Sequence, residues 1–186
     1  SWSRIVSMPN DRNQPVIDQN THEAAIFGGG KSLALYVHWP FCRSKCPYCD
    51  FNSHVRDAVD QTRWRDGLLR ELEYFANVTN YREIGSIFFG GGTPSLMPPA
   101  TVTAIIDAAS SHWRFAGDVE ITLEANPTSV EARKFADLRA AGVNRVSLGV
   151  QSLNDKALAF LGREHSAEDA KHAISLSQRI FPRSSF

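Results

Sequence analysis

The feature that most constrains the fold of this chain is a regular alternation of short apolar segments and helical segments from residue 33 onward. Four apolar segments predict strands, at residues 33–38, 84–89, 119–124 and 145–150. Repeated strand–helix units favour a parallel sheet with right-handed crossovers and helices outside. The sequence therefore predicts an α/β fold, a partial (βα) barrel whose fifth strand would begin at Ser184, where the chain ends.

The predicted helices have recognisable boundaries. Proline suits the first turn of a helix, serine its cap, and glycine the position after its end. Trp64, Leu68, Leu72 and Phe75 recur at helical spacing. Together these signals predict helices over residues 58–77, 98–112, 129–141 (with Ser129 as the cap and Gly142 past the end), 154–161 and 166–180.

Polar or glycine-rich residues follow every predicted strand. A loop with cysteines follows the first strand, and the run GGGTPS, residues 90–95, follows the second. Glu124 ends the third strand and Gln151 follows the fourth. In barrels of parallel strands the chemistry lies at the carboxyl ends of the strands. We therefore expect these four strand ends to form one site.

All three cysteines lie in one short loop, as Cys42, Cys46 and Cys49, with the spacing C-x3-C-x2-C. Three thiolates can hold three irons of a [4Fe–4S] cluster and leave the fourth iron open to a substrate or cofactor. The odd number of cysteines and their tight spacing argue against a disulfide framework. The alternative is a zinc site with His54 or Asp50 as the fourth ligand. Zinc sites usually pair C-x2-C with another close pair, and the sequence has none.

Composition and charge argue against several classes of protein. The hydrophobic fraction of 42% and the charged fraction of 22% are typical of a globular domain. The formal net charge of zero gives no electrostatic footprint for nucleic acid. No apolar run approaches the roughly 20 residues that a membrane span needs. Cysteines in a metal-type spacing favour a reducing compartment, so we expect a cytoplasmic location.

Residues 1–32 differ in composition from the rest of the chain. They are rich in Asn, Asp, Pro and Gly with little periodicity, which predicts a flexible N-terminal leader before a core domain at 33–186. The run GGGKS at 28–32 is not a P-loop, because that motif needs glycine where this chain has Ala25.

The cysteine spacing, with Tyr48 just before the last cysteine, resembles that of the radical S-adenosylmethionine (SAM) family. The resemblance covers residues 33–186 and implies that Cys42, Cys46 and Cys49 bind a [4Fe–4S] cluster. It further implies that the open iron chelates SAM, whose reductive cleavage yields a 5′-deoxyadenosyl radical. Six strings resemble the branch of this family that includes coproporphyrinogen dehydrogenases (HemN) and heme chaperones (HemW): LYVHWPFC, CPYCDFNSH, IFFGGGTPS, LEANP, RVSLGVQS and LGREHS.

The resemblance also implies which residues bind SAM. Two tyrosines would line its site, and the glycine-rich run would meet the amino group of its methionine part. Polar residues at the later strand ends would hold the remaining groups, the arginine being suited to a carboxylate. A second SAM can bind nearby in this branch, so which residue serves which molecule stays open. The implied residues are Tyr36, Tyr48, Gly91, Gly92, Thr93, Glu124, Gln151 and Arg163.

One position separates the two members of the branch. HemN-type decarboxylases carry a fourth cysteine two positions after the third, where this chain has Phe51. The resemblance therefore implies the heme chaperone, which passes heme to respiratory haemoproteins, including membrane-associated ones, with flavodoxin or ferredoxin as electron donor. The alternative is an oxygen-independent coproporphyrinogen III dehydrogenase. Heme binding itself is expected mainly through a later part of the family that carries an HNxxYW-type motif.

Overall fold

The computed structural model describes residues 32–56, 58–79 and 81–186. Apart from Ser32, the predicted leader lies outside the described residues, so its boundary with the core domain stays a prediction. Among the described residues, no helix combines the length and the apolar character that crossing a bilayer requires.

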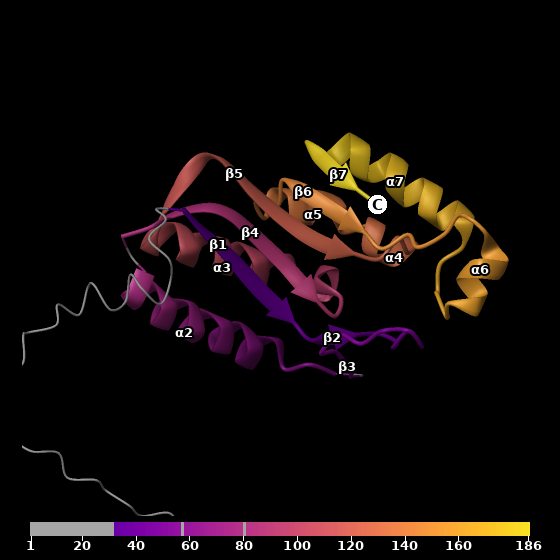
Figure 1. The fold of residues 1–186 in the computed structure, drawn as a ribbon, viewed down its shortest axis with the longest axis horizontal. Coiled ribbons are helices and arrows are strands. Elements are labelled where there is room, and N and C mark those ends of the chain that lie inside the picture. The colour runs from indigo at the N-terminus through magenta and orange to yellow at the C-terminus, as the bar shows by residue number, and fades with distance from the viewer. Residues whose placement is uncertain (1–31, 57, 80) are drawn as a thin grey trace, which may run out of the picture. The chain divides into compact units, whose positions relative to one another are not determined.

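A five-stranded parallel sheet forms the centre of the fold (Figure 1). Its strand order is β1-β4-β5-β6-β7, and each neighbouring pair is parallel. The parallel α/β fold and its four predicted strands are confirmed, and the fifth strand begins one residue earlier than expected. The strands are β1 (Ser32–Trp39), β4 (Glu83–Gly91), β5 (Arg114–Ala125), β6 (Arg145–Leu148) and β7 (Arg183–Ser185).

The helices follow the predicted order with two differences. The first helix begins at Gln61, not at residue 58, because Asp60 accepts a hydrogen bond from the Arg63 N–H at 2.9 Å and caps it. The single helix expected over 129–141 is wrong: it is two short helices, and the cap is Thr128. The helices are α2 (Gln61–Thr79), α3 (Pro99–His112), α4 (Ser129–Ala132), α5 (Phe135–Ala140), α6 (Asp155–Phe160) and α7 (Ala167–Ile180).

The two faces of the sheet differ in polarity. Along β5, Ile121 and Leu123 are buried in the core that the helices cover, whereas Glu120 and Glu124 alternate with them on the other face. Phe135 of α5 is fully buried and meets Phe181 edge to face at 5.7 Å. The packed face therefore carries the core, and the opposite face presents polar groups toward the strand ends.

A short pair of strands that the sequence did not predict closes the cysteine loop. β2 (Phe41–Cys42) pairs with β3 (His54–Val55), and the His54 N–H donates to the Pro40 carbonyl at 2.6 Å. A further short element, the 3₁₀ helix η1 (Pro94–Leu96), follows β4. In Figure 1, β2, β3 and α6 all lie beyond the carboxyl ends of the strands.

Candidate functional site

The cysteine loop leaves the carboxyl end of β1 and returns through β3. Its base is fixed by aromatic packing, because the ring of Phe41 meets Trp64 of α2 edge to face at 5.0 Å. Within the loop, the Cys49 N–H donates to the Cys46 carbonyl at 3.0 Å. The three cysteines are free thiols, each half-buried. The fold therefore places the three sulfurs on one constrained loop.

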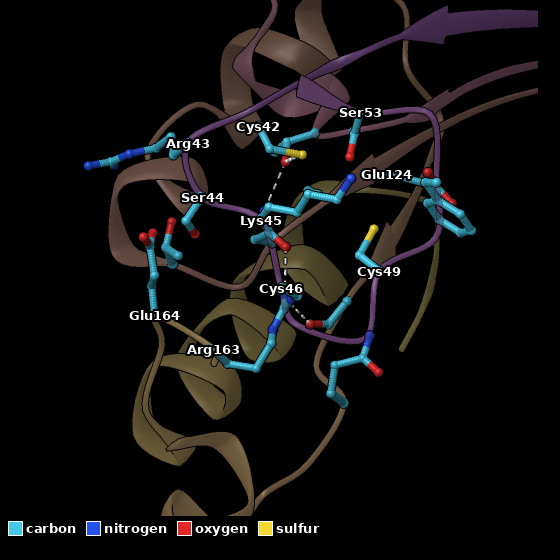
Figure 2. A pocket seen from close by; sticks show the side chains of 18 of the residues that line it. Cys42, Arg43, Ser44, Lys45, Cys46, Cys49, Ser53, Glu124, Arg163 and Glu164 are labelled. Atoms are coloured by element: carbon cyan, nitrogen blue, oxygen red, sulfur yellow. Dashed lines mark hydrogen bonds between the residues drawn. The ribbon is translucent and has the colours of Figure 1, made fainter. Parts of the chain in front are cut away.

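A cavity of about 540 Å³ lies between this loop and the ends of β4, β5 and β6. It brings together the features that follow four different strands, as the sequence predicted. Figure 2 shows side chains of the cysteine loop together with Glu124 and Arg163, which come from other parts of the chain. The predicted site residues that line it are Cys42, Cys46, Tyr48, Cys49, Gly91, Gly92, Thr93, Glu124, Gln151 and Arg163.

Tyr36 lies apart from the lining of this cavity. It lines a second cavity beside α2, its hydroxyl lies 3.3 Å from Nδ1 of His38, and its ring stacks on Phe88. A role for Tyr36 in binding SAM stays a prediction.

Two of the three cysteine sulfurs accept hydrogen bonds from other elements. Nη1 of Arg163 donates to Sγ of Cys46 at 3.3 Å, and the hydroxyl of Thr93 donates to Sγ of Cys42 at 3.4 Å (Figure 2). Donors of this kind stabilise negative charge on thiolate sulfur. The surroundings of the sulfurs therefore suit a thiolate-bound cluster.

Two buried donors in the cavity have no partner among the described residues. They are Oγ of Ser53, whose side chain is 5% exposed, and Nε of Arg163. Ser53 lines the cavity together with Cys42 and Cys49, and Figure 2 labels all three. A buried donor without a partner is costly, and a ligand in the cavity would supply one. Within the described part of the chain, no three His, Cys, Asp or Glu side chains are grouped tightly enough to hold one metal ion. A cubane instead gives each thiolate its own iron, so it suits more widely spaced sulfurs.

The fold itself requires glycine at positions 91 and 92, with no ligand present. Gly91 has a φ of +113°, and a Cβ there would lie 2.7 Å from the His38 ring. A Cβ on Gly92 would lie 2.7 Å from the Phe41 carbonyl oxygen, because the Gly92 N–H donates to the Trp39 carbonyl at 2.7 Å. Close approach of two backbones explains both glycines. Whether they also touch SAM stays a prediction.

The remaining predicted residues differ in their electrostatic setting. Burial raises the pKa of Glu124, and a hydrogen bond from the Gly91 N–H at 3.3 Å opposes that rise. Burial also raises the pKa of Tyr48. Gln151 has a φ of 63° at the mouth of the cavity. Positive φ is uncommon for a residue other than glycine, and such backbone strain clusters at functional sites.

Three residues at the site were not predicted: Ser95, Asn126 and Glu131. Asn126 accepts a hydrogen bond from Nη2 of Arg163 at 2.7 Å. Glu131 is 2% exposed and accepts a hydrogen bond from Ser95. Asn126 lies within the string LEANP, so its motif was visible, but Glu131 looks like an ordinary residue of a helix.

The comparison with known families covers most of the chain. The Radical SAM superfamily matches residues 36–186. The heme chaperone HemW of Escherichia coli (strain K12) is 44% identical over 153 residues, which cover 82% of this chain and 40% of that protein. A Bos taurus protein named "Radical S-adenosyl methionine domain-containing protein 1, mitochondrial" is 42% identical over 181 residues, which cover 97% of this chain and 40% of that protein. The chain thus spans about two fifths of the length of these relatives.

A solved structure supports the same assignment. It is described as "Coproporphyrinogen III oxidase (HemN) from Escherichia coli is a Radical SAM enzyme". Its TM-score is 0.76 at 28% identity, over 90% of this chain and 39% of that one. The resemblance to the HemN and HemW branch is therefore confirmed, as is the partial barrel of the radical SAM type. The family implies a [4Fe–4S] cluster and SAM. On its strand order, its cysteine loop and these matches, the chain belongs to the radical SAM superfamily.

Proposed function

We propose that Cys42, Cys46 and Cys49 hold a [4Fe–4S] cluster and that the same cavity binds SAM, as the N-terminal part of a heme chaperone of the HemW type. The observation that carries this proposal is the single cavity in which all three thiols meet residues that follow three further strands. The two donors to sulfur and the two buried donors without partners support it.

The chain's own residues would bind and shield the reacting groups. When bound, the cluster supplies the electron that cleaves SAM, and the protein contributes position and electrostatics. Thr93 and Arg163 would offset charge on the sulfurs, since each already donates to one. Glu124 would accept hydrogen bonds from polar groups of SAM. Nε of Arg163 is a further donor for the ligand.

The chaperone is favoured over the decarboxylase by one residue and by one relative. Phe51 lines the cavity with 58% of its surface exposed, at the position where the decarboxylases carry a fourth cysteine. A relative named heme chaperone is 44% identical, against 28% for the structure named coproporphyrinogen III oxidase. Heme, haemoprotein recipients, a flavodoxin or ferredoxin donor and a cytoplasmic location belong to this proposal. Coproporphyrinogen III dehydrogenase remains the second candidate, supported by the shared fold.

Anaerobic reconstitution tests the cluster. The chain should take up about four irons and four sulfides and absorb visible light through thiolate-to-iron transitions. Changing any one of Cys42, Cys46 or Cys49 to alanine should abolish this, because three ligands are the minimum for the site. Ser44→Ala, on the same exposed stretch of the loop, is the matched control and should load normally. Stoichiometric zinc without iron in anaerobically purified protein would contradict the proposal.

A further inference from the structure

A buried carboxylate lies behind both donors to the cysteine sulfurs. We propose that Glu131 is a positioning residue that fixes the direction of two hydrogen-bond chains, one ending on Cys42 and one on Cys46. The inference rests on the proposed function, since these sulfurs would carry the cluster. It assigns the charge environment of the cluster to a residue that does not touch it.

Glu131 is surrounded by donors. It accepts hydrogen bonds from the Ser95 hydroxyl, from the Asn126 backbone N–H at 2.8 Å and from Nδ2 of Asn126 at 3.3 Å. Burial raises the pKa of Glu131, and the bonds from Ser95 and Asn126 oppose that rise. An ionised carboxylate only accepts hydrogen bonds. The three donors around Glu131 favour its ionised form, and in that form it can accept from Asn126 but cannot donate to it.

Glu131, which accepts, and Arg163, which only donates, select the same orientation of the Asn126 amide. A side-chain amide can turn over and exchange its oxygen and nitrogen, and only its partners decide between the two. Because Nδ2 must face Glu131, Oδ1 faces Arg163 and accepts from Nη2 at 2.7 Å. The same Nδ2 lies 3.3 Å from the Thr93 hydroxyl and donates to it.

The orientation of Asn126 then sets both donors to sulfur. The Thr93 hydroxyl has one proton, and since its oxygen accepts from Asn126, that proton points to Sγ of Cys42 at 3.4 Å. Arg163 is held by Asn126 and by the Gly149 carbonyl at 2.7 Å, which leaves Nη1 on Sγ of Cys46 at 3.3 Å. Both chains begin at the same carboxylate.

Hydrogen bonds to the sulfurs help to set the reduction potential of an iron–sulfur cluster. They stabilise the reduced form, which carries one more electron, and so raise the potential. Glu131 would therefore tune the potential without being a ligand. Its replacement should shift the potential while the iron content stays the same.

Glu131→Gln tests the direction of the chains. The amide oxygen of the introduced glutamine keeps accepting from the backbone N–H of Asn126. Its nitrogen then faces Nδ2 of the Asn126 side chain, so two donors meet. Asn126 then either turns over, which sets its nitrogen against the donor-only Arg163, or moves away from position 131; in both cases its hydrogen bonds to Thr93 and Arg163 are weakened. Both sulfurs would lose a donor.

The readout is the midpoint potential of the reconstituted cluster, from a redox titration followed by electron paramagnetic resonance. Loss of the Glu131 charge would by itself raise the potential, so a potential more negative than that of wild type, at equal iron content, identifies the loss of donors to the sulfurs and is the result expected of Glu131→Gln. Glu83→Gln is the matched control, because Glu83 lies at the start of β4, paired with Arg114, and should leave the potential unchanged. A fully loaded Glu131→Gln with the wild-type potential would overturn the inference alone. A wild-type chain that takes up no iron would contradict the proposed function as well.

A double variant separates the two chains. In Glu131→Gln with Asn126→Asp, the new carboxylate at position 126 accepts from the introduced amide and again from Arg163, which restores the donor to Cys46. It also draws the Thr93 proton away from Cys42. The double variant has the formal charge of wild type and lacks the donor to Cys42, so its potential should be more negative than that of wild type. If Glu131→Gln takes up no cluster, the potential of the double variant can still be compared with that of wild type. A double variant at the wild-type potential would overturn the inference.

Discussion

At the scale of single residues, the cavity contains some residues that the fold requires and others that are free to bind a ligand, and the sequence pattern does not distinguish the two kinds. The resemblance implies that Gly91 and Gly92 meet SAM, but a valine at Gly91 would not test this contact. That side chain would strain a φ of +113° and collide with His38 before it reached any ligand. A change at Glu124 is cleaner, because its carboxylate lines the cavity and has only the Gly91 N–H as a hydrogen-bond partner among the described residues.

Glu124→Gln should weaken SAM binding and remove part of its pH dependence. Burial raises the pKa of Glu124, so its carboxyl holds a proton up to a higher pH than an ordinary glutamate. The ionised form accepts hydrogen bonds from SAM, so affinity should fall as the pH is lowered through this raised pKa. Loss of hydrogen bonds to a charged group costs about 1.5–3 kcal/mol, on the order of ten- to a hundredfold in Kd.

Calorimetry on reconstituted protein, repeated between neutral and acidic pH, measures this effect. Glu168→Gln is the control, since Glu168 lies exposed on α7 and should preserve both the affinity and its pH profile. If Glu124→Gln binds SAM as wild type does at every pH, Glu124 is not part of the SAM site.

The bounds of helices and strands were predicted correctly where local sequence signals set them, and were missed where contacts with distant parts of the chain set them. α3 and α7 begin and end within a residue of expectation, because proline at the start of α3 and the Ser166 capping box at α7 are local signals. The break between α4 and α5 was missed. There the Lys134 N–H bonds to the Glu131 carbonyl, three residues back, while the Glu131 side chain turns inward to Ser95 and Asn126. The β2–β3 pair is too short to have a period at all.

Asn144 illustrates an element completed by a side chain. Its Oδ1 accepts from the Ile121 N–H at 2.8 Å and its Nδ2 donates to the Val119 carbonyl at 2.8 Å. The paired residues of β5 and β6 begin at Thr122 and Arg145, and the Asn144 N–H donates to the Ile121 carbonyl at 3.0 Å, so the Asn144 side chain extends this ladder toward Val119.

Asn144→Ala should therefore destabilise the chain by about 1–3 kcal/mol, the cost of leaving buried backbone groups unpaired. Denaturant unfolding monitored by circular dichroism measures it. Asn154→Ala, which removes the cap of the short helix α6, provides a comparison expected near about 1 kcal/mol. An Asn144→Ala chain as stable as wild type would show that water replaces both hydrogen bonds.

At the scale of the whole molecule, the sequence predicted where the site lies but not the hydrogen bonds that connect its residues. Strand-end placement and cysteine spacing identified the cavity because both follow from local pattern and parallel topology. The contacts that orient Arg163 could not be predicted in this way. They join Asn126 after β5, Gly149 after β6 and Cys46 after β1, which are distant in sequence and meet only when the sheet forms.

The chain spans about two fifths of the length of its relatives, so the proposed function is best tested on a protein of the relatives' length. With SAM and a reductant, the full-length protein should not convert coproporphyrinogen III to protoporphyrinogen IX, since Phe51 stands where the decarboxylases have a cysteine. It should bind heme instead. On the proposed function, the present chain alone should bind heme poorly and SAM more weakly than a longer protein, because the resemblance implies that later segments of the family complete both sites.

Phe51→Cys in the full-length protein sharpens the test. The side chain of Phe51 lies at the cavity, yet one restored thiol cannot place a substrate, because radical chemistry needs the reacting atoms held in close alignment by many groups. We therefore expect no decarboxylated porphyrin from this variant, by anaerobic chromatography, with the cluster and SAM binding intact. A HemN-type enzyme assayed in parallel is the positive control. Robust turnover by the wild-type protein would make the decarboxylase the correct function, and turnover by Phe51→Cys alone would show that this single position decides between the two activities.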